Sequence, residues 1–160
     1  MQSFLIFYNI SANISLYKYN IEGYKMKICG IELKSNNAIL SIIDSSNEEI
    51  NYIDTKLKKI ILDNDEDKSS LLSFKNEIDN FLDKNQVEKV IIKKRSKKGT
   101  FAGGVITFKM EGIIQLNSIC EVEFISSQAI GKYTKKNDVE FPASLNKYQE
   151  QSYLSAMLVA

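Results

Sequence analysis

A run of cations between positions 93 and 98 lies immediately before a glycine-containing apolar stretch. The sequence reads Lys93-Lys94-Arg95-Ser96-Lys97-Lys98, followed by Gly99-Thr100-Phe101-Ala102-Gly103-Gly104. A helix predicted to begin at Phe101 would present free backbone N–H groups and its positive dipole end to these side chains. This concentration of positive charge favours binding of an anion such as phosphate. We therefore predict phosphate or nucleic-acid contacts from Lys94, Arg95, Lys97, Lys98, Gly103, Gly104 and Lys109.

Arg95 strengthens this interpretation because it is the single arginine among 21 basic residues. Its planar guanidinium binds phosphate or carboxylate through two parallel hydrogen bonds, which a lysine cannot do. The alternative is a solvated loop whose charges are neutralised by the acidic run Asp63-Asn64-Asp65-Glu66-Asp67. Both interpretations remain open from the sequence.

Charge and composition limit the chemistry that the chain can perform. Its 21 basic and 20 acidic residues nearly balance, so an affinity for polyanions has to come from local clusters. The chain has no histidine, which removes the commonest general base, the Ser-His-Asp triads and most zinc sites. Acid–base work would then fall to carboxylates, lysines or a metal-bound water. Cys29 and Cys120 lie far apart in apolar segments, and we expect buried thiols in a reducing compartment.

Length and hydropathy indicate one domain, because 160 residues with 44% hydrophobic side chains suffice for a single core. No apolar run approaches the roughly 18 residues of a membrane span, and residues 3–8 lack the basic flank of a secretory signal. A cytoplasmic protein is expected. Residues 1–25 show no sustained period, whereas a clean strand begins at Met26. We expect residues 1–25 to be an extension that is disordered or not part of the native chain, and residues 26–160 to be the domain.

Hydrophobic periodicity predicts the elements of this domain. Strands are expected at 27–33 and 38–44, joined by a polar hairpin, with a third strand within 55–62. Further strands are expected at 87–92 and 121–125. Helices are expected at 67–85, 101–116, 128–134 and 145–158, the first capped by Asp67 or Ser69.

The order of these elements predicts an α/β fold. Three strands that pair as a meander are followed by alternating helices and strands, whose right-handed crossovers place helices on both faces of a mixed sheet. A five-stranded sheet with the order 3-2-1-4-5 is the layout of the ribonuclease H-like fold. A flavodoxin-like sheet fits less well, because the first three strands have no helices between them.

Several motifs resemble a bacterial family catalogued as domain of unknown function 3010, and the resemblance runs from about Met26 to the C-terminus. The family name implies no known activity. In the first strand, Gly30-Ile31-Glu32 is similar to the Gly-Ile-Asp of Holliday-junction resolvases and other ribonuclease H-like nucleases. The motifs that resemble the family are Lys27-Ile28-Cys29-Gly30-Ile31-Glu32-Leu33-Lys34, Lys98-Gly99-Thr100-Phe101-Ala102-Gly103-Gly104, Phe108-Lys109-Met110-Glu111 and Gln115.

The likeness to these nucleases implies an acidic centre that holds two Mg²⁺ or Mn²⁺ ions. Acids would come from the end of the first strand, the end of the fourth and the last helix. It implies Glu32 and Glu150 as catalytic, metal-binding residues. Glu111, on the polar stripe of the helix predicted at 101–116, would supply a third catalytic acid if that stripe reaches the strand ends. After residues 87–92, however, the chain supplies Lys93-Lys94 where an acid is wanted. A lysine there would take the place of a metal's charge and pair with Glu32 or Glu150.

These observations favour a ribonuclease H-like domain that binds nucleic acid or another phosphate-rich ligand and is a degenerate nuclease. One alternative is a Mg²⁺- or Mn²⁺-dependent nuclease that uses Glu32 and Glu150. Another is a non-catalytic protein-interaction module with a basic loop. The sequence leaves open whether the protein is an enzyme.

Overall fold

Two strands with apolar residues on both faces form the centre of the sheet. The computed structural model describes residues 26–46, 49–96 and 104–160, and the expectations for residues 1–25 lie outside them. β1 (Met26–Lys34) and β2 (Asn37–Ser46) pair antiparallel through a tight turn, in which Ser35 has a φ of 56°. Residues 28–33 and 38–43 are buried, as a central position in the sheet requires.

Four further strands complete the sheet. β3 (Glu49–Ile53) and β4 (Lys59–Ile61) pair antiparallel with opposite halves of β2. β5 (Lys89–Lys93) lies parallel to β1, and β6 (Glu121–Ile125) lies parallel to β5. The order β3-β2-β1-β5-β6, with β4 beside β2, confirms the predicted order. Within the predicted segment 55–62 only β4 is a strand, and β3 was not predicted because its first three residues are exposed.

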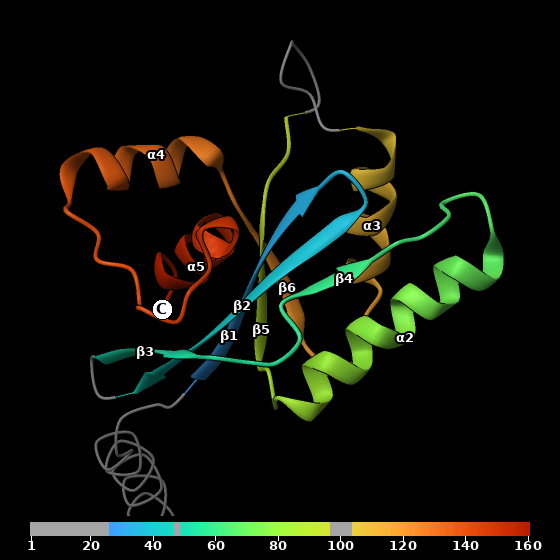
Figure 1. Ribbon diagram of the computed structural model, residues 1–160, viewed down its shortest axis with the longest axis horizontal. Helices are drawn as coiled ribbons and strands as arrows, with labels where there is room; N and C mark the ends of the chain where they lie inside the picture. Colours follow the sequence, from blue (N-terminus) through green and yellow to red (C-terminus); the bar gives the residue numbers. More distant parts are fainter. Residues whose placement is uncertain (1–25, 47–48, 97–103) are drawn as a thin grey trace, which may run out of the picture.

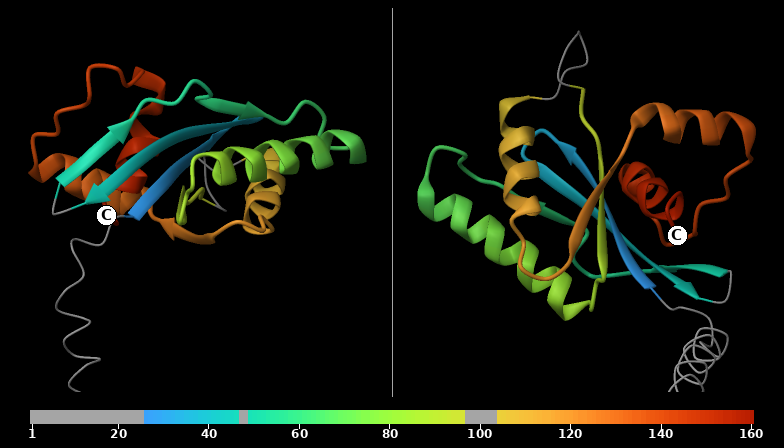
Figure 2. Two further views of the ribbon diagram at one scale, coloured as in Figure 1. Left: turned by 90° about the horizontal axis from the view of Figure 1, so that it is seen from below. Right: turned by 180° about the vertical axis from the view of Figure 1, so that it is seen from behind.

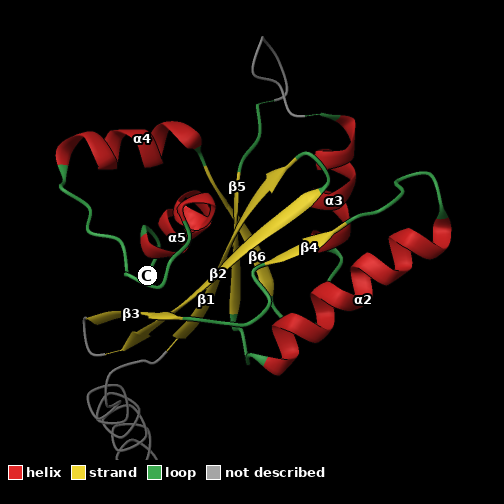
Figure 3. Ribbon diagram, in the orientation of Figure 1, coloured by secondary structure: helices red, strands yellow, loops and turns green. Residues whose placement is uncertain are grey.

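Helices cover both faces of the sheet (Figures 1 and 2). α2 (Lys68–Lys84) and α3 (Val105–Gln115) pack on one face. α4 (Ser127–Lys136), the short 3₁₀ helix η1 (Lys147–Gln149) and α5 (Glu150–Met157) lie on the other (Figure 3). Asp67 caps α2 as predicted, since its carboxylate accepts from the backbone N–H of Ser70. The helix predicted from Phe101 begins at Val105 in the described part of the chain.

The sheet separates two hydrophobic cores. Alternate residues of β1, among them Cys29 and Ile31, pack with Phe74 of α2 and Met110 of α3. Ile28, the residue before Cys29, packs on the other face, with residues of α4 and α5. Side chains of one strand therefore reach opposite cores, which decides which site residues can meet. Among the described residues, none of the helices combines the length and hydropathy that a membrane crossing requires.

α5 packs directly on the backbone of β1 at Gly30. A Cβ atom at Gly30 would lie 1.8 Å from the carbonyl oxygen of Ser152 and 2.9 Å from the backbone nitrogen of Ala156. Beside this contact the hydroxyls of Ser41 and Ser152 are 2.7 Å apart. Only a glycine permits this approach, and the paired hydroxyls fix the rotation of the helix about its axis.

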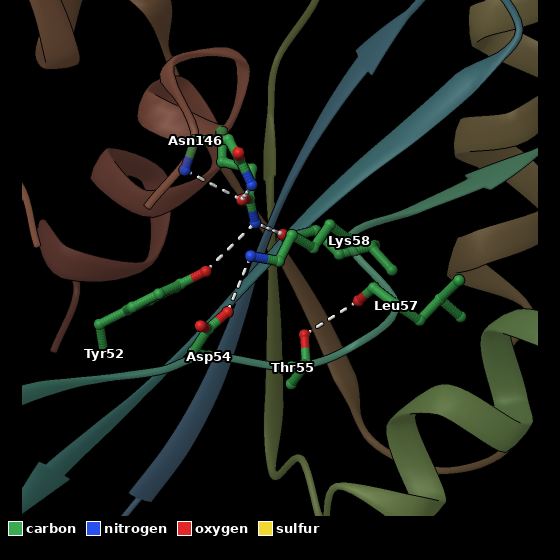
Figure 4. Close-up of polar contacts among 8 residues, drawn as sticks. Tyr52, Asp54, Thr55, Leu57, Lys58 and Asn146 are labelled. Atoms are coloured by element: carbon green, nitrogen blue, oxygen red, sulfur yellow. Dashed lines mark hydrogen bonds and ion pairs between the residues drawn. The ribbon is translucent and has the colours of Figure 1, made fainter. Parts of the chain in front are cut away.

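Gln149 anchors the start of α5 from a fully buried position. Its amide Nε2 donates to the Leu40 carbonyl at 2.8 Å and to the Tyr52 hydroxyl at 3.4 Å. Its Oε1 accepts from the side-chain nitrogen of Asn146 at 2.9 Å. Figure 4 shows Asn146 and Tyr52 at the ends of this network, so η1 is tied to both β2 and β3.

Replacing Gly30 with alanine is expected to lower the free energy of unfolding by about 3 kcal/mol or more, because the new Cβ collides with α5 backbone rather than with a movable side chain. Urea unfolding measures the loss. Gly112→Ala in α3 is the matched control, since no atom lies within 4 Å of its added Cβ. That change should raise stability by about 0.5–1 kcal/mol. Equal behaviour of the two variants would contradict the close contact.

Candidate functional site

Glu32 and Lys93 lie side by side at the carboxyl ends of two parallel strands. Ile31 of β1 pairs with Ile92 of β5, so the residues that follow them are neighbours on the face covered by α5. The Lys93 Nζ donates to Oε1 of Glu32 at 3.1 Å. The exposed fraction is 14% for the Lys93 side chain and 11% for that of Glu32. The predicted pairing of a lysine with Glu32 is confirmed.

This ion pair does not suit a divalent cation. A metal bound to Glu32 would compete with the ammonium of Lys93 for the same carboxylate and would be repelled by its charge. Mg²⁺ and Mn²⁺ prefer several oxygen ligands. Within the described ranges, no group of three or more histidine, cysteine, aspartate or glutamate side chains gathers in a way that could hold a metal. The residues at this end of the sheet therefore do not fit the metal centre that the nuclease likeness implied.

Glu150 is the first residue of α5 and is half-buried. Ser152 points at the sheet, where its hydroxyl meets that of Ser41. Glu150 precedes Ser152 by two residues, which places its side chain about 200° around the helix axis. The structure thus pairs Glu32 with Lys93, and no ion pair or hydrogen bond of the described residues joins Glu150 to either of them.

Glu111 lies across the sheet from Glu32. It belongs to α3, whose residues Met110 and Ile114 pack in the core that Glu32 does not enter. Its Oε2 is buried and has no hydrogen-bond partner in the described part of the chain. The structure therefore does not gather Glu32, Glu150 and Glu111 into one acidic cluster.

The basic run continues directly from this ion pair. The Lys94 backbone N–H donates to the Ile125 carbonyl at 2.8 Å, and its carbonyl accepts from the Ser127 hydroxyl at 3.4 Å. Lys94 is exposed and Arg95 is half-buried, with an Nε that has no partner among the described residues. The backbone at Lys94 is thus held beside the first turn of α4. Lys97, Lys98 and Gly103 of the predicted site lie outside the described residues.

Gly104 is the N-cap residue of α3 and makes no side-chain cap. It is exposed, so the first backbone N–H groups of α3 have no side-chain acceptor from the cap position. One is nevertheless used, because the Thr107 N–H donates to the Gly104 carbonyl at 3.0 Å. The prediction of a helix start following the basic run holds, with the start at Val105.

The acidic run is engaged elsewhere. The Asp65 carboxylate lies 2.6 Å from the Lys109 Nζ of α3, and Asp67 caps α2. No ion pair of residues 26–46, 49–96 and 104–160 joins this run to Lys94 or Arg95. Lys109 of the predicted phosphate site is therefore held by Asp65, on the side of the sheet away from Glu32.

Sequence reasoning missed the polar side chains that position α5. Ser41, Gln149 and Ser152 are each at most 1% exposed and form one hydrogen-bonded group. A signal was present, because Ser41 interrupts the alternation of Ile39 and Ile43 opposite Gly30. A polar residue at an inward position beside a glycine indicates close packing of backbone against the strand.

The two cysteines are not nucleophiles at neutral pH. Burial raises the pKa of the Cys29 thiol far above its usual range. Burial, with a smaller contribution from Asp79, raises the pKa of Cys120 to about 11. Both side chains therefore remain thiols, and the described structure shows both as free cysteines.

Comparison with known proteins identifies a family and a fold. A family model described as "Protein of unknown function (DUF3010)" matches residues 26–159, as the motifs indicated. No curated protein matches the chain. Thermus thermophilus RuvC has 8% identity over 82% of this chain and 92% of its own, with a TM-score of 0.64. The fowlpox virus resolvase in complex with Holliday junction DNA has 17% identity over 84% and 96%, with a TM-score of 0.51. These similarities confirm the ribonuclease H-like fold.

Removing either partner of the Glu32–Lys93 pair is expected to destabilise the domain. Glu32→Gln and Lys93→Gln should each lower the free energy of unfolding by about 2–3 kcal/mol, because each leaves a largely buried charge without its partner. The double variant should lose less than the sum, with a coupling of about 1–2 kcal/mol in urea unfolding. Additive losses would show that the two side chains do not interact.

Lys93→Glu is expected to create a response to Mg²⁺ and Mn²⁺ that the wild-type protein lacks. Two adjacent carboxylates repel each other, and a divalent cation relieves that repulsion. Saturating metal should raise the melting temperature of the variant by several degrees, as ligand binding to the native state requires. Adding Glu32→Gln to this variant is the control and should abolish the response. A metal response of the wild-type protein that Glu32→Gln removes would contradict our assignment.

Proposed function

The chain belongs to the DUF3010 family, and on that premise we propose that it is a nucleic-acid-binding, ribonuclease H-like domain descended from a nuclease and lacking metal-dependent catalysis. The domain comprises residues 26–160. Binding takes place at the carboxyl end of β5, through Lys94 and Arg95 and the start of α3. Lys97, Lys98 and Gly103 extend the proposed site into the segment between β5 and α3.

The observation that carries this proposal is the excess of positive charge at the end of β5. Glu32 neutralises Lys93, the first cation of the run. The next two, Lys94 and Arg95, have no acidic partner in the described structure. A ligand with phosphate groups supplies the missing counter-charge, and the Arg95 guanidinium offers a fork that matches two phosphate oxygens.

The fold supports nucleic acid as the source of that phosphate. T. thermophilus RuvC has been solved in complex with a Holliday junction substrate, with a TM-score of 0.55 to this chain. The fowlpox virus resolvase has also been solved with junction DNA. A ribonuclease H-like sheet is therefore compatible with binding a nucleic-acid backbone, and the cations at the end of β5 provide the attraction here.

The same arrangement supports binding without cleavage. Metal-dependent hydrolysis needs carboxylates that hold divalent cations, one of which activates water. In this chain Glu32 is bound to Lys93, Glu111 belongs to a helix on the other face of the sheet, and the carboxylates of the described residues do not gather into a group of three or more that could hold a metal. An ammonium neutralises a phosphate oxygen without activating water. Lys93 and Glu32 thus form a largely buried pair beneath the site, and Lys94 and Arg95 make the contacts to the ligand.

Binding of labelled single-stranded, duplex, hybrid and branched nucleic acids to the full chain tests this proposal. Lys94→Ala/Arg95→Ala should weaken binding at least tenfold and reduce the slope of log affinity against log salt by about 2, since two phosphate contacts are lost. Lys56→Ala/Lys84→Ala is the control of equal charge, because both side chains are exposed beside α2 rather than at the end of β5. Absence of binding to any form at low salt would refute the proposal.

The same samples distinguish a binding domain from a nuclease. Incubation with Mg²⁺ or Mn²⁺ should leave every substrate intact, because the described carboxylates do not form a metal centre. Cleavage by the wild-type protein that Glu32→Gln and Glu150→Gln each abolish would establish the metal-dependent nuclease instead.

A further inference from the structure

α4 carries an unbalanced positive charge that the proposed site does not use. Its sequence, Ser127 to Lys136, contains Lys132, Lys135 and Lys136 and no acidic residue. All three lysines are exposed. α2 differs in this respect, since it mixes both signs and pairs Lys75 with Asp79 at 2.6 Å. A solvated helix commonly balances its charges in this second way.

The three lysines of α4 share one face of the helix. Ile130 is 2% exposed and faces the core formed with α5. At 100° per residue, the lysines lie between about 140° and 240° around the axis from Ile130, opposite the buried side. They therefore form a single outward stripe, which we call the α4 stripe: Lys132, Lys135 and Lys136.

The helix dipole explains only part of this arrangement. Lys135 and Lys136 lie in the last turn, where cations are favourable. Lys132 is one turn earlier and repels both of them at spacings of three and four residues. Asp138 and Glu140 follow the helix and are exposed, but no ion pair of the described residues connects them to the α4 stripe.

α4 begins beside the basic residues at the end of β5. The first turn of α4 is joined to Lys94, whose carbonyl accepts from the Ser127 hydroxyl and whose N–H donates to the Ile125 carbonyl just before the helix. Figure 1 shows α4 leading away from this end of the sheet, over α5. Nine residue steps from Ser127 to Lys136 extend about 14 Å along the helix axis.

We propose that α4 is a second contact element for the phosphate backbone of double-stranded nucleic acid. The inference rests on the proposed function and adds to it the form of the ligand. A duplex presents one negative charge per 1.7 Å or so of its axis, so it can face Lys94, Arg95 and the α4 stripe, whose far end lies about 14 Å along the helix axis from Ser127, at the same time. A short phosphate compound at the end of β5 cannot reach the far end of α4. The contacts are to the backbone and carry no sequence preference.

Salt-dependent binding of a labelled duplex to the full chain tests this inference. Lys132→Gln/Lys135→Gln/Lys136→Gln should weaken binding about tenfold or more at 0.1 M salt and reduce the salt slope by about 2–3. The matched control is Lys56→Gln/Lys68→Gln/Lys84→Gln, which removes the same charge from exposed positions on and beside α2. The control should change the slope by less than about 1. Circular dichroism of both variants verifies that the helices are retained.

The outcomes separate this inference from the proposed function. If the α4 variant binds like the wild type while Lys94→Ala/Arg95→Ala loses binding, the α4 contact is refuted and the proposed function stands. Equal losses in the α4 variant and its control would also refute the inference, because net charge alone would then explain binding. Inorganic polyphosphate that binds as tightly as duplex, with the same dependence on α4, would overturn the assignment to nucleic acid. Failure of the wild-type protein to bind any nucleic acid would refute both.

Discussion

The contact between α5 and β1 at Gly30 determines how the candidate site is arranged. The backbone of α5 lies so close to the strand that a Cβ at Gly30 would overlap the Ser152 carbonyl. The two elements cannot separate without breaking the hydrogen bond between the Ser41 and Ser152 hydroxyls, both of which are buried. The rotation of α5 against the sheet is therefore fixed. Glu32, two residues after Gly30 on β1, forms its ion pair with Lys93 of β5.

The Glu32–Lys93 pair affects the charge of the surface at the end of β5 more than it affects the stability of the fold. Largely buried ion pairs contribute little net stabilisation, because desolvation offsets most of their attraction. The effect on the surface is larger. By neutralising Lys93, Glu32 confines the unbalanced charge to residues that extend beyond the sheet, beginning with Lys94. The cations thus lie at the exposed end of β5, where a large ligand can reach them.

Much of the fold could be predicted from the sequence because its strong signals are local. The apolar runs of β1 and β2, the Asp67 cap of α2 and the run in β6 each need only neighbouring residues to be recognised. β3 was missed because Glu49, Ile50 and Asn51 are exposed and give no inward pattern. The pairing of Lys93 could be predicted only as a choice between Glu32 and Glu150. That choice depends on the register of β1 and β5, which places Ile31 opposite Ile92 and so brings together Glu32 and Lys93, 61 residues apart in the sequence.

Lys109 shows why the predicted phosphate site could not be completed from sequence. Lys109 lies little more than one helical turn after Gly104, the N-cap of α3. Its position in the chain therefore favours a role shared with the basic run. In the structure the loop before α2 brings Asp65 to it, and this contact depends on how α2 and α3 pack together. A charged side chain is available to bind a ligand only where the fold leaves it without a partner, and the sequence alone does not show which charges these are.

A lysine, rather than an acid, stands at the end of β5, and this limits what the sheet can do with a phosphate backbone. A metal held by carboxylates provides a mobile positive charge that binds water and can activate it. The ammonium of Lys93 is attached to the chain, is present without added metal, and has no free coordination position. On the proposed function, the domain keeps the electrostatic attraction of a ribonuclease H-like nuclease for its ligand and loses the hydrolytic step. On that proposal, binding to nucleic acid depends on salt and requires no divalent metal.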